Sequence, residues 1–272
     1  MHKFLPLGLI TLLIGCYGEQ ANTQGRQEQS MRNINDTLQY SYQNLKETSP
    51  YFITCGTKDA VDTTFYQISY PIFSSKRINE VLRPSILIDN EDTPHDAADS
   101  FLDAYNEFVE DSNMQKINAA WFKNVQTKVL VNTPRLLTVK TTVEEYTGGA
   151  HGNHLTLYAN IDLLKAEKLQ LKDLIMPDKL EELRRIAEQY FRQKERLSDT
   201  ASLAKDFFFP DGLFVLNDNF GLTKEHLLLF YNEYEIKPYA AGVTELAIPY
   251  RELTKVWSAR GKYYLQSLSN NF

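Results

Sequence analysis

The feature that most constrains the fold is a set of three consecutive runs in which apolar or β-branched residues alternate with polar ones. The first two runs, "WFKNVQTKVLVNT" and "RLLTVKTTVEEY", are separated by a turn at Pro134, and the third run is "HLTLYANIDL". A period of two is typical of strands with one buried face. A short turn between two such runs predicts an antiparallel hairpin. The centre of the chain is therefore expected to form antiparallel sheet.

Segments with helical or strand character flank this centre. Helices are expected at "SKRINEVLRPSI", "DAADSFLDAYNEFVED" and "LEELRRIAEQYFRQKERL", and a weak helix at "INDTLQYSYQNLKE". The second helix has a predicted buried stripe of Ala97, Phe101, Ala104, Tyr105 and Phe108. Further strands are expected at "DTTFYQISYP", "GLFVLND", "EHLLLFYNEYEI" and "GVTELAIPY". Strands grouped around isolated helices, without strict βαβ alternation, predict an α+β fold with antiparallel sheets, packed amphipathic helices and two sub-domains.

The first sixteen residues have the pattern of a secretory leader. A cationic start precedes an apolar run over residues 4–14, which is too short for the ~20 residues that cross a bilayer. The run ends at Gly15-Cys16, which resembles the lipobox at which bacterial lipoproteins are acylated, for example with palmitate, and cleaved. We therefore expect residues 1–15 to be a signal peptide and Cys16 to carry a membrane anchor of more than one acyl chain.

The predicted domain organisation follows from these patterns. Residues 16–49 are expected to be the lipidated Cys and a polar tether, residues 50–140 an N-terminal α+β domain, and residues 141–257 a C-terminal α+β domain; residues 258–272 are expected to be a tail.

Charge and cysteine content exclude several classes of partner and site. A net charge of −6 argues against nucleic acid and favours a basic protein partner. Once Cys16 is lipidated, Cys55 has no partner for an internal disulfide and is expected to be a buried, inert thiol.

The stretch "GGAHGNH" raises the question of a metal or catalytic site. A zinc site needs three or four converging ligands, whereas the glycines disfavour a helix that would align His151 with His154. On a strand, residues three apart point to opposite faces. We therefore expect Gly148 and Gly149 to form a turn that His151 supports, with no cofactor and no metal. A metal-dependent hydrolase that uses both histidines is the alternative.

Sequence templates for other catalytic sites are missing, and aromatic residues point to binding instead. The sequence contains no G-x-S-x-G, P-loop or G-x-G-x-x-G motif. A second concentration of tyrosines lies at residues 231–250, where core packing and surface display are both open readings. The candidate binding surface comprises Tyr146, Gly148, Gly149, His151, His154, Tyr234 and Tyr239.

Three stretches together resemble a known pair of extracytoplasmic domains. "YTGGAHGN…NIDL…LQLKDLI" and "YEIKPYAAGVTELAIPY" resemble the extracytoplasmic domain of RsiV-type anti-sigma factors, which also occurs beside the catalytic domain of PdaC-type peptidoglycan deacetylases. "FYQISYPIFSS…INEVL" resembles the domain that precedes it. The resemblance implies a binding or sensing module, which in RsiV binds lysozyme. Here Leu164-Lys165-Ala166-Glu167 replaces the glycine-bearing turn that the family has after "NIDL".

The resemblance and the leader together give a functional expectation. With a leader in place of a sigma-binding segment and transmembrane helix, and no deacetylase motifs, the chain is expected to be neither an anti-sigma factor nor an enzyme. It is expected to be a lipid-anchored envelope protein that binds peptidoglycan or another cell-wall glycan, or a lysozyme-like enzyme. A structural or assembly lipoprotein is the alternative. Tyr17, in place of the Asp that retains lipoproteins in the inner membrane, predicts the outer membrane, facing the periplasm or the cell surface.

Overall fold

The computed structural model describes residues 37–55, 60–111 and 119–269 of the chain. Residues Ile34–Phe272 form one compact unit. Cys16, the predicted leader and most of the predicted tether lie outside the described residues, as does the side chain of Cys55. Among the described helices, none has the length and apolar character required to cross a membrane.

A six-stranded sheet forms the first half of this unit. Its strands follow one another in chain order: β1 Tyr40–Cys55, β2 Ala60–Phe73, β3 Phe122–Asn132, β4 Leu136–Tyr146, β5 Asn153–Asp162 and β6 Glu167–Lys168. Neighbouring strands are antiparallel, except that β2 and β3 run parallel. This parallel pair is possible because two helices connect its strands. The hairpin predicted from the period-two runs is confirmed as β3–β4, with Val125 opposite Val143.

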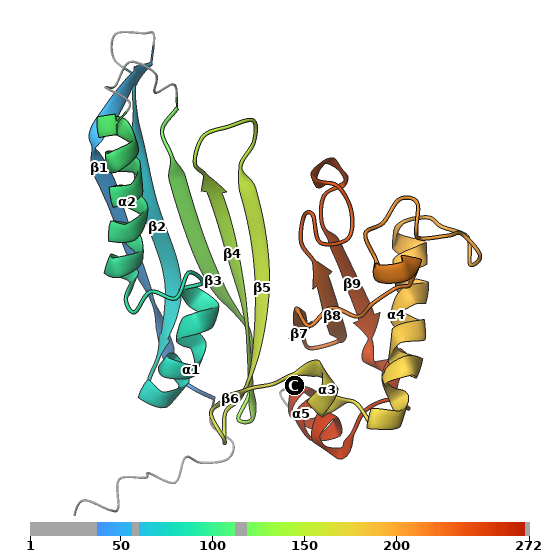
Figure 1. The fold of residues 1–272 in the computed structure, drawn as a ribbon. Coiled ribbons are helices and arrows are strands. Elements are labelled where there is room, and N and C mark those ends of the chain that lie inside the picture. Colours follow the sequence, from blue (N-terminus) through green and yellow to red (C-terminus); the bar gives the residue numbers. More distant parts are fainter. Residues whose placement is uncertain (1–36, 56–59, 112–118, 270–272) are drawn as a thin grey trace, which may run out of the picture. The chain divides into compact units, whose positions relative to one another are not determined.

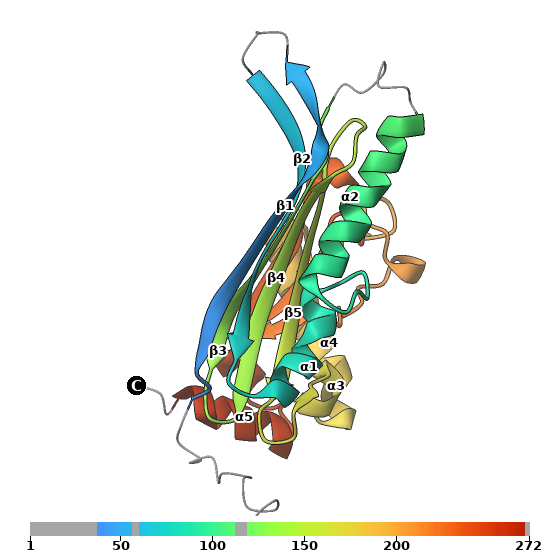
Figure 2. The same ribbon diagram turned by 90° about the vertical axis from the view of Figure 1, so that its left-hand side faces the viewer.

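Two helices, α1 (Lys76–Ile86) and α2 (Pro94–Asp111), cover one face of this sheet (Figures 1 and 2). Ser75 caps the start of α1 by accepting a hydrogen bond from the amide of Ile78. The core between the helices and the sheet is mainly aliphatic and includes Ile68, Leu82 and Val139, each fully buried.

The buried stripe of α2 differs from the predicted one. Ala97 and Tyr105 are buried as predicted, but Ala98, Leu102 and Val109 are buried in place of Phe101, Ala104 and Phe108. Phe108 is 42% exposed and its ring lies parallel to that of Trp121, with centroids 5.3 Å apart. Compared with the predicted orientation, α2 is rotated about its axis. Large aromatic residues pack at the side of the helix against Trp121, while smaller residues face the sheet.

A three-stranded antiparallel sheet forms the second half of the unit, with strands β7 (Phe220–Leu222), β8 (His226–Tyr231) and β9 (Thr244–Pro249). The helices of this half are α3 Leu171–Leu174, α4 Leu180–Lys194 and α5 Ala259–Ser269, and 3₁₀ turns lie at Pro177–Lys179, Pro210–Gly212, Tyr239–Ala241 and Tyr250–Leu253. A second core, which includes Leu183, Phe191 and Ile248, packs α4 against the sheet. The predicted α+β fold is confirmed, although the parallel β2–β3 pair departs from the expected antiparallel sheets.

Asparagine side chains join the two sheets along β5. The Asn219 amide accepts from the backbone N–H of Tyr158 at 2.9 Å and donates to the carbonyl of Thr156 at 2.7 Å. Asn232 accepts from the N–H of Thr156 at 2.7 Å and donates to the same carbonyl. Because a side-chain amide has the donor and acceptor of a peptide group, the two residues continue the hydrogen bonding that a further strand would provide.

Asn160 connects the two sheets in the opposite direction, from β5 of the large sheet to β7 of the small sheet. It lies on β5, is buried, and donates to the carbonyl of Phe220 at 2.8 Å while accepting from the N–H of Leu222 and the hydroxyl of Thr138. The first residue of the "NIDL" stretch therefore fastens β7 to the large sheet.

Two predicted elements are wrong. The segment predicted as a weak helix at residues 34–47 contributes residues 40–47 to β1, because their backbone pairs with β2 in an unbroken register from Tyr40 to Thr48. "GLFVLND" is not a strand: β7 begins only at Phe220, and within the predicted run Leu213 is 64% exposed. The alternation does follow burial, because Phe214 is buried between the exposed Leu213 and Val215, but this run belongs to neither of the described sheets.

The domain limits in the structure differ from those drawn from the sequence. The expected limit at 140/141 falls inside β4 (Leu136–Tyr146), so the large sheet extends across it. Residues 40–49 of the expected tether belong to β1. The expected tail contains α5 (Ala259–Ser269), and the hydroxyl of Tyr264 on this helix donates a hydrogen bond to the carboxylate of Asp162 at 2.6 Å. The turn after "NIDL" forms without glycine, because Ala166 adopts a φ of 51°.

Asn160→Ala is expected to destabilise the protein strongly. The substitution leaves the buried amide of Leu222 and carbonyl of Phe220 without partners, and each such group costs about 1–3 kcal/mol. We expect urea denaturation to show a loss of about 3 kcal/mol in the free energy of unfolding. Asn153→Ala, at an exposed position of the same strand, is the control. Equal losses for the two variants would contradict the proposed role of Asn160.

Candidate functional site

The turn between β4 and β5 depends on its glycines. Gly148 and Gly149 have φ angles of 91° and 98°, a region that L-residues with side chains rarely adopt. A Cβ atom on Gly152 would lie 2.9 Å from the carbonyl oxygen of Glu145, which is closer than real contacts allow. The predicted role of the glycines in a tight turn is confirmed.

His151 lies at the tip of this turn and stacks on Tyr239. The two rings are 3.9 Å apart between centroids and inclined by 18°. The Nδ1 atom of His151 is 3.0 Å from the carbonyl oxygen of Gly152, and the hydroxyl of Tyr239 donates to the same carbonyl at 3.0 Å. The histidine thus joins the turn to a segment almost ninety residues further along the chain.

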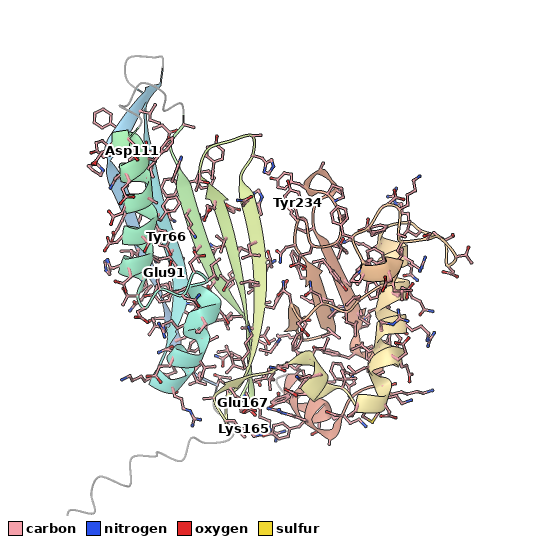
Figure 3. All side chains as sticks on the ribbon, viewed as in Figure 1. Tyr66, Glu91, Asp111, Lys165, Glu167 and Tyr234 are labelled. Atoms are coloured by element: carbon pink, nitrogen blue, oxygen red, sulfur yellow. The ribbon has the colours of Figure 1, made fainter. Side chains whose placement is uncertain are left out.

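That segment is the loop at residues 232–242, which follows β8. Asn232 fixes its start to β5, and the ammonium of Lys237, 2.7 Å from the carboxylate of Glu195, fixes its middle. The loop carries Tyr234, whose ring centroid is 5.6 Å from that of Tyr239 and whose hydroxyl is 3.5 Å from Nε2 of His151. Figure 3 shows Tyr234 in this loop, facing the β4–β5 turn.

Tyr234 combines high exposure with an unfavourable backbone. Its φ is 66°, and a bulky residue in this left-handed region costs on the order of 1–3 kcal/mol. The residue is nevertheless 57% exposed, so burial does not offset this cost. Such strain is most often found where function requires a side chain in a fixed place.

Tyr146 and His154 flank the cluster of His151, Tyr234 and Tyr239. The hydroxyl of Tyr146 donates to the carbonyl of Gly149 at 3.1 Å, so this residue supports the turn. His154 is on β5, half exposed, with Nδ1 3.6 Å from a carboxylate oxygen of Glu233. The structure therefore brings all seven candidate surface residues together at the β4–β5 turn and the 232–242 loop.

The cluster is aromatic with an acidic border. Partial burial and then the nearby charge of Glu233 raise the pKa of the Tyr239 phenol above its usual range. Glu144 and Glu235 are exposed close by. The site thus presents neutral rings and hydrogen-bond acceptors.

The other tyrosines of the 231–250 stretch belong to the core. The hydroxyl of Tyr231 donates to the carbonyl of Val215 at 2.7 Å, and that of Tyr250 to the carbonyl of Thr223 at 2.7 Å. Burial raises the pKa of both phenols. Core packing is therefore confirmed for Tyr231 and Tyr250, whereas Tyr234 lies exposed at the surface.

The two histidines have separate environments. His151 contacts Tyr239, whereas His154 faces Glu233. In the described part of the chain, no three His, Cys, Asp or Glu residues are grouped so that they could hold a metal ion. The metal-dependent hydrolase requires such a group around His151 and His154.

Sequence reasoning missed Glu233 and the asparagines that place the loop. Asn219 and Asn232 stand at the ends of the strands β7 and β8, where an asparagine usually indicates only a turn. Asn160 gave no signal either, because the alternation of apolar residues places it on the face expected to be polar, whereas the structure buries it.

Tyr234→Asn is expected to stabilise the fold. Asn tolerates the left-handed region far better than Tyr, and little packing is lost at a residue that is 57% exposed. We expect the free energy of unfolding to rise by about 1 kcal/mol. Tyr42→Asn, at an exposed strand residue, is the control and should not stabilise. If Tyr234→Asn instead lowers the free energy of unfolding, the contacts of the Tyr234 ring stabilise the fold by more than the backbone strain costs.

Comparison with known proteins gives two family matches and several similar solved structures, of which two are described. Residues 57–154 match the family described as deacetylase PdaC, and residues 172–251 match the protein family of unknown function DUF3298. No curated protein matches the chain. A DUF3298 family member from Bacteroides fragilis aligns with a TM-score of 0.65 at 21% identity, over 87% of this chain and 100% of that one. A DUF3298 family protein from Pseudomonas aeruginosa aligns with a TM-score of 0.60 at 21% identity, over 83% and 97%. The chain therefore pairs a PdaC-like region with a DUF3298 region, the domain pair that its sequence motifs indicated.

Proposed function

We propose that this chain is a lipid-anchored bacterial envelope protein whose paired domains form a binding or sensing module. The ligand is a cell-wall glycan or a lysozyme-like enzyme, and it binds at the cluster of His151, Tyr234 and Tyr239. The leader that ends at Cys16 supports the lipid anchor, and Tyr17 supports the outer membrane.

The observation that carries the proposal is the strained, exposed Tyr234 beside the His151–Tyr239 stack. Exposed rings held in place by a rigid scaffold supply contact area with little loss of conformational entropy on binding. The scaffold here comes from both sheets, because the turn belongs to β4–β5 and the loop follows β8. A ligand at this position therefore contacts both halves of the unit.

We propose that the module binds without chemistry. His151 supports this view, because its ring stacks on Tyr239 and its Nδ1 atom is in contact with the carbonyl of Gly152. These contacts give the His151 ring a structural role. An assay for release of acetate from acetylated glycans would show whether the relation to deacetylase PdaC extends to activity.

An assembly role is the second candidate, and one observation favours it. Phe208, Leu213 and Val215, from the segment that precedes β7, are 54%, 64% and 46% exposed. Exposed apolar residues that gather on one segment are typical of a contact with another protein. This apolar surface shares no residue with the aromatic cluster. Substitutions in one or the other therefore distinguish an assembly role from a ligand-binding role.

The proposal is tested with the full chain, purified in detergent and titrated with soluble peptidoglycan fragments and with lysozyme. We expect one of the two to bind, and Tyr239→Ala to weaken binding at least tenfold because it removes the stacking partner of His151. Leu213→Ser is the control and should bind normally. Unchanged binding by Tyr239→Ala, or no binding by the unsubstituted chain, would contradict the proposal.

A further inference from the structure

The face of the large sheet opposite α1 and α2 carries two rows of side chains that cross the strands. The aromatic row consists of Phe65, Phe122 and Tyr146, which are in register on β2, β3 and β4. The polar row consists of Lys46, Gln67, Asn124, Glu144 and His154, which are in register on β1 to β5. Both rows alternate with the buried residues Tyr66 and Val125 and therefore point away from the helices.

The aromatic row is a series of nearly parallel rings. Centroids are 5.9 Å apart between Phe65 and Phe122 and 6.2 Å apart between Phe122 and Tyr146, with interplanar angles of 18° and 25°. Rings at this separation are offset, so part of each ring face is left uncovered. All three side chains are half-buried, and Figure 2 shows α1 and α2 on the other side of the sheet.

The polar row has unused hydrogen-bonding capacity. Within the described part of the chain, the side chains of Gln67, Asn124 and Glu144 make no hydrogen bond or ion pair. Two amides offer both donors and acceptors, and a carboxylate offers acceptors. The ammonium of Lys46 lies 4.6 Å from the ring centroid of Phe65. The row therefore combines little net charge with many free polar atoms.

Both rows lead into the candidate site. Tyr146 ends the aromatic row and donates to Gly149 in the turn that carries His151. His154 ends the polar row and faces Glu233 of the 232–242 loop. The cluster of the proposed function is thus one end of a longer surface, which we call the track, made of the two rows and the cluster.

We propose that the track binds a linear glycan that lies across the strands, an inference that rests on the proposed function and assigns its ligand class. The polar row alone crosses five strands, about 19 Å at roughly 4.8 Å per strand spacing. A ligand that fills it must be extended. A chain of sugar rings presents C–H groups to aromatic faces and hydroxyls to amides at regular intervals, which suits the two parallel rows.

The charge of the polar row favours a glycan over a protein. Lys46 and Glu144 oppose each other in sign, and the amides between them are neutral. A protein partner of stable affinity would need a broad apolar centre, whereas the aromatic row is one ring wide and is bordered by polar groups.

The test uses the full chain in detergent and soluble oligomers of N-acetylglucosamine with two, four and six sugars, with lysozyme as the protein probe. We expect affinity to rise with oligomer length. Asn124→Ala and Gln67→Ala should each weaken binding of the six-sugar oligomer about tenfold and leave the two-sugar oligomer less affected. Gln193→Ala, at an exposed amide on α4, is the matched control and should change nothing.

The outcomes separate this inference from the proposed function. Affinity that is independent of length, and sensitive to Tyr239→Ala but not to Asn124→Ala, would overturn the track and leave the proposed site intact. Binding of lysozyme without binding of any oligomer would contradict the proposal that the track binds a glycan and would leave the proposed binding or sensing function intact. Failure of both probes to bind the unsubstituted chain would contradict both proposals.

Discussion

The structure depends on how β5 is satisfied along the part of its outer edge that the short strand β6 leaves unpaired. An edge strand exposes unpaired amide and carbonyl groups, which cost free energy when buried and invite pairing with other chains when exposed. Here Asn219 and Asn232 present their side-chain amides to the backbone of Thr156 and Tyr158. Each amide replaces a peptide group of a missing strand. The large sheet therefore ends against the small one without sharing a strand with it.

This junction determines where the aromatic cluster lies. Because Asn232 is both a partner of β5 and the first residue of the 232–242 loop, the loop starts at a fixed distance from the β4–β5 turn. Tyr239 can then stack on His151, and its hydroxyl reaches Gly152. Contacts of Asn232 and Lys237, which lie on either side of Tyr234, hold it in a backbone conformation that an isolated loop would leave. The strain at Tyr234 is thus maintained by interactions whose main role is to close a sheet edge.

The sequence was informative where one face of an element is buried and less so elsewhere. The strands β3, β4 and β5 could be predicted because buried residues such as Val125, Val139 and Ile161 alternate with polar ones. The first part of β1 could not, because its residues from Tyr40 to Asn44 are all exposed and leave no pattern of burial. The face of α2 was misjudged because Trp121, a residue distant in sequence, attracts Phe108. The candidate surface was found from its glycines and aromatics, whereas a left-handed Tyr234 has no sequence signature.

The residues that carry the family resemblance are largely those that build the scaffold. In "NIDL", Asn160 fastens β7, and Asp162 accepts from the backbone of the following turn and from Tyr264. In "YTGGAHGN", Gly152 avoids a clash, and in the later motif Tyr239 bonds to the same turn. A resemblance that rests on such residues indicates that the two sheets are joined in the same way, and it gives little information about the ligand. Side chains that the fold leaves unpaired, such as Asn124, which no quoted motif contains, are free to differ without disturbing this scaffold. Chains that share this scaffold can therefore differ in what they bind while keeping the same turn, loop and asparagine contacts.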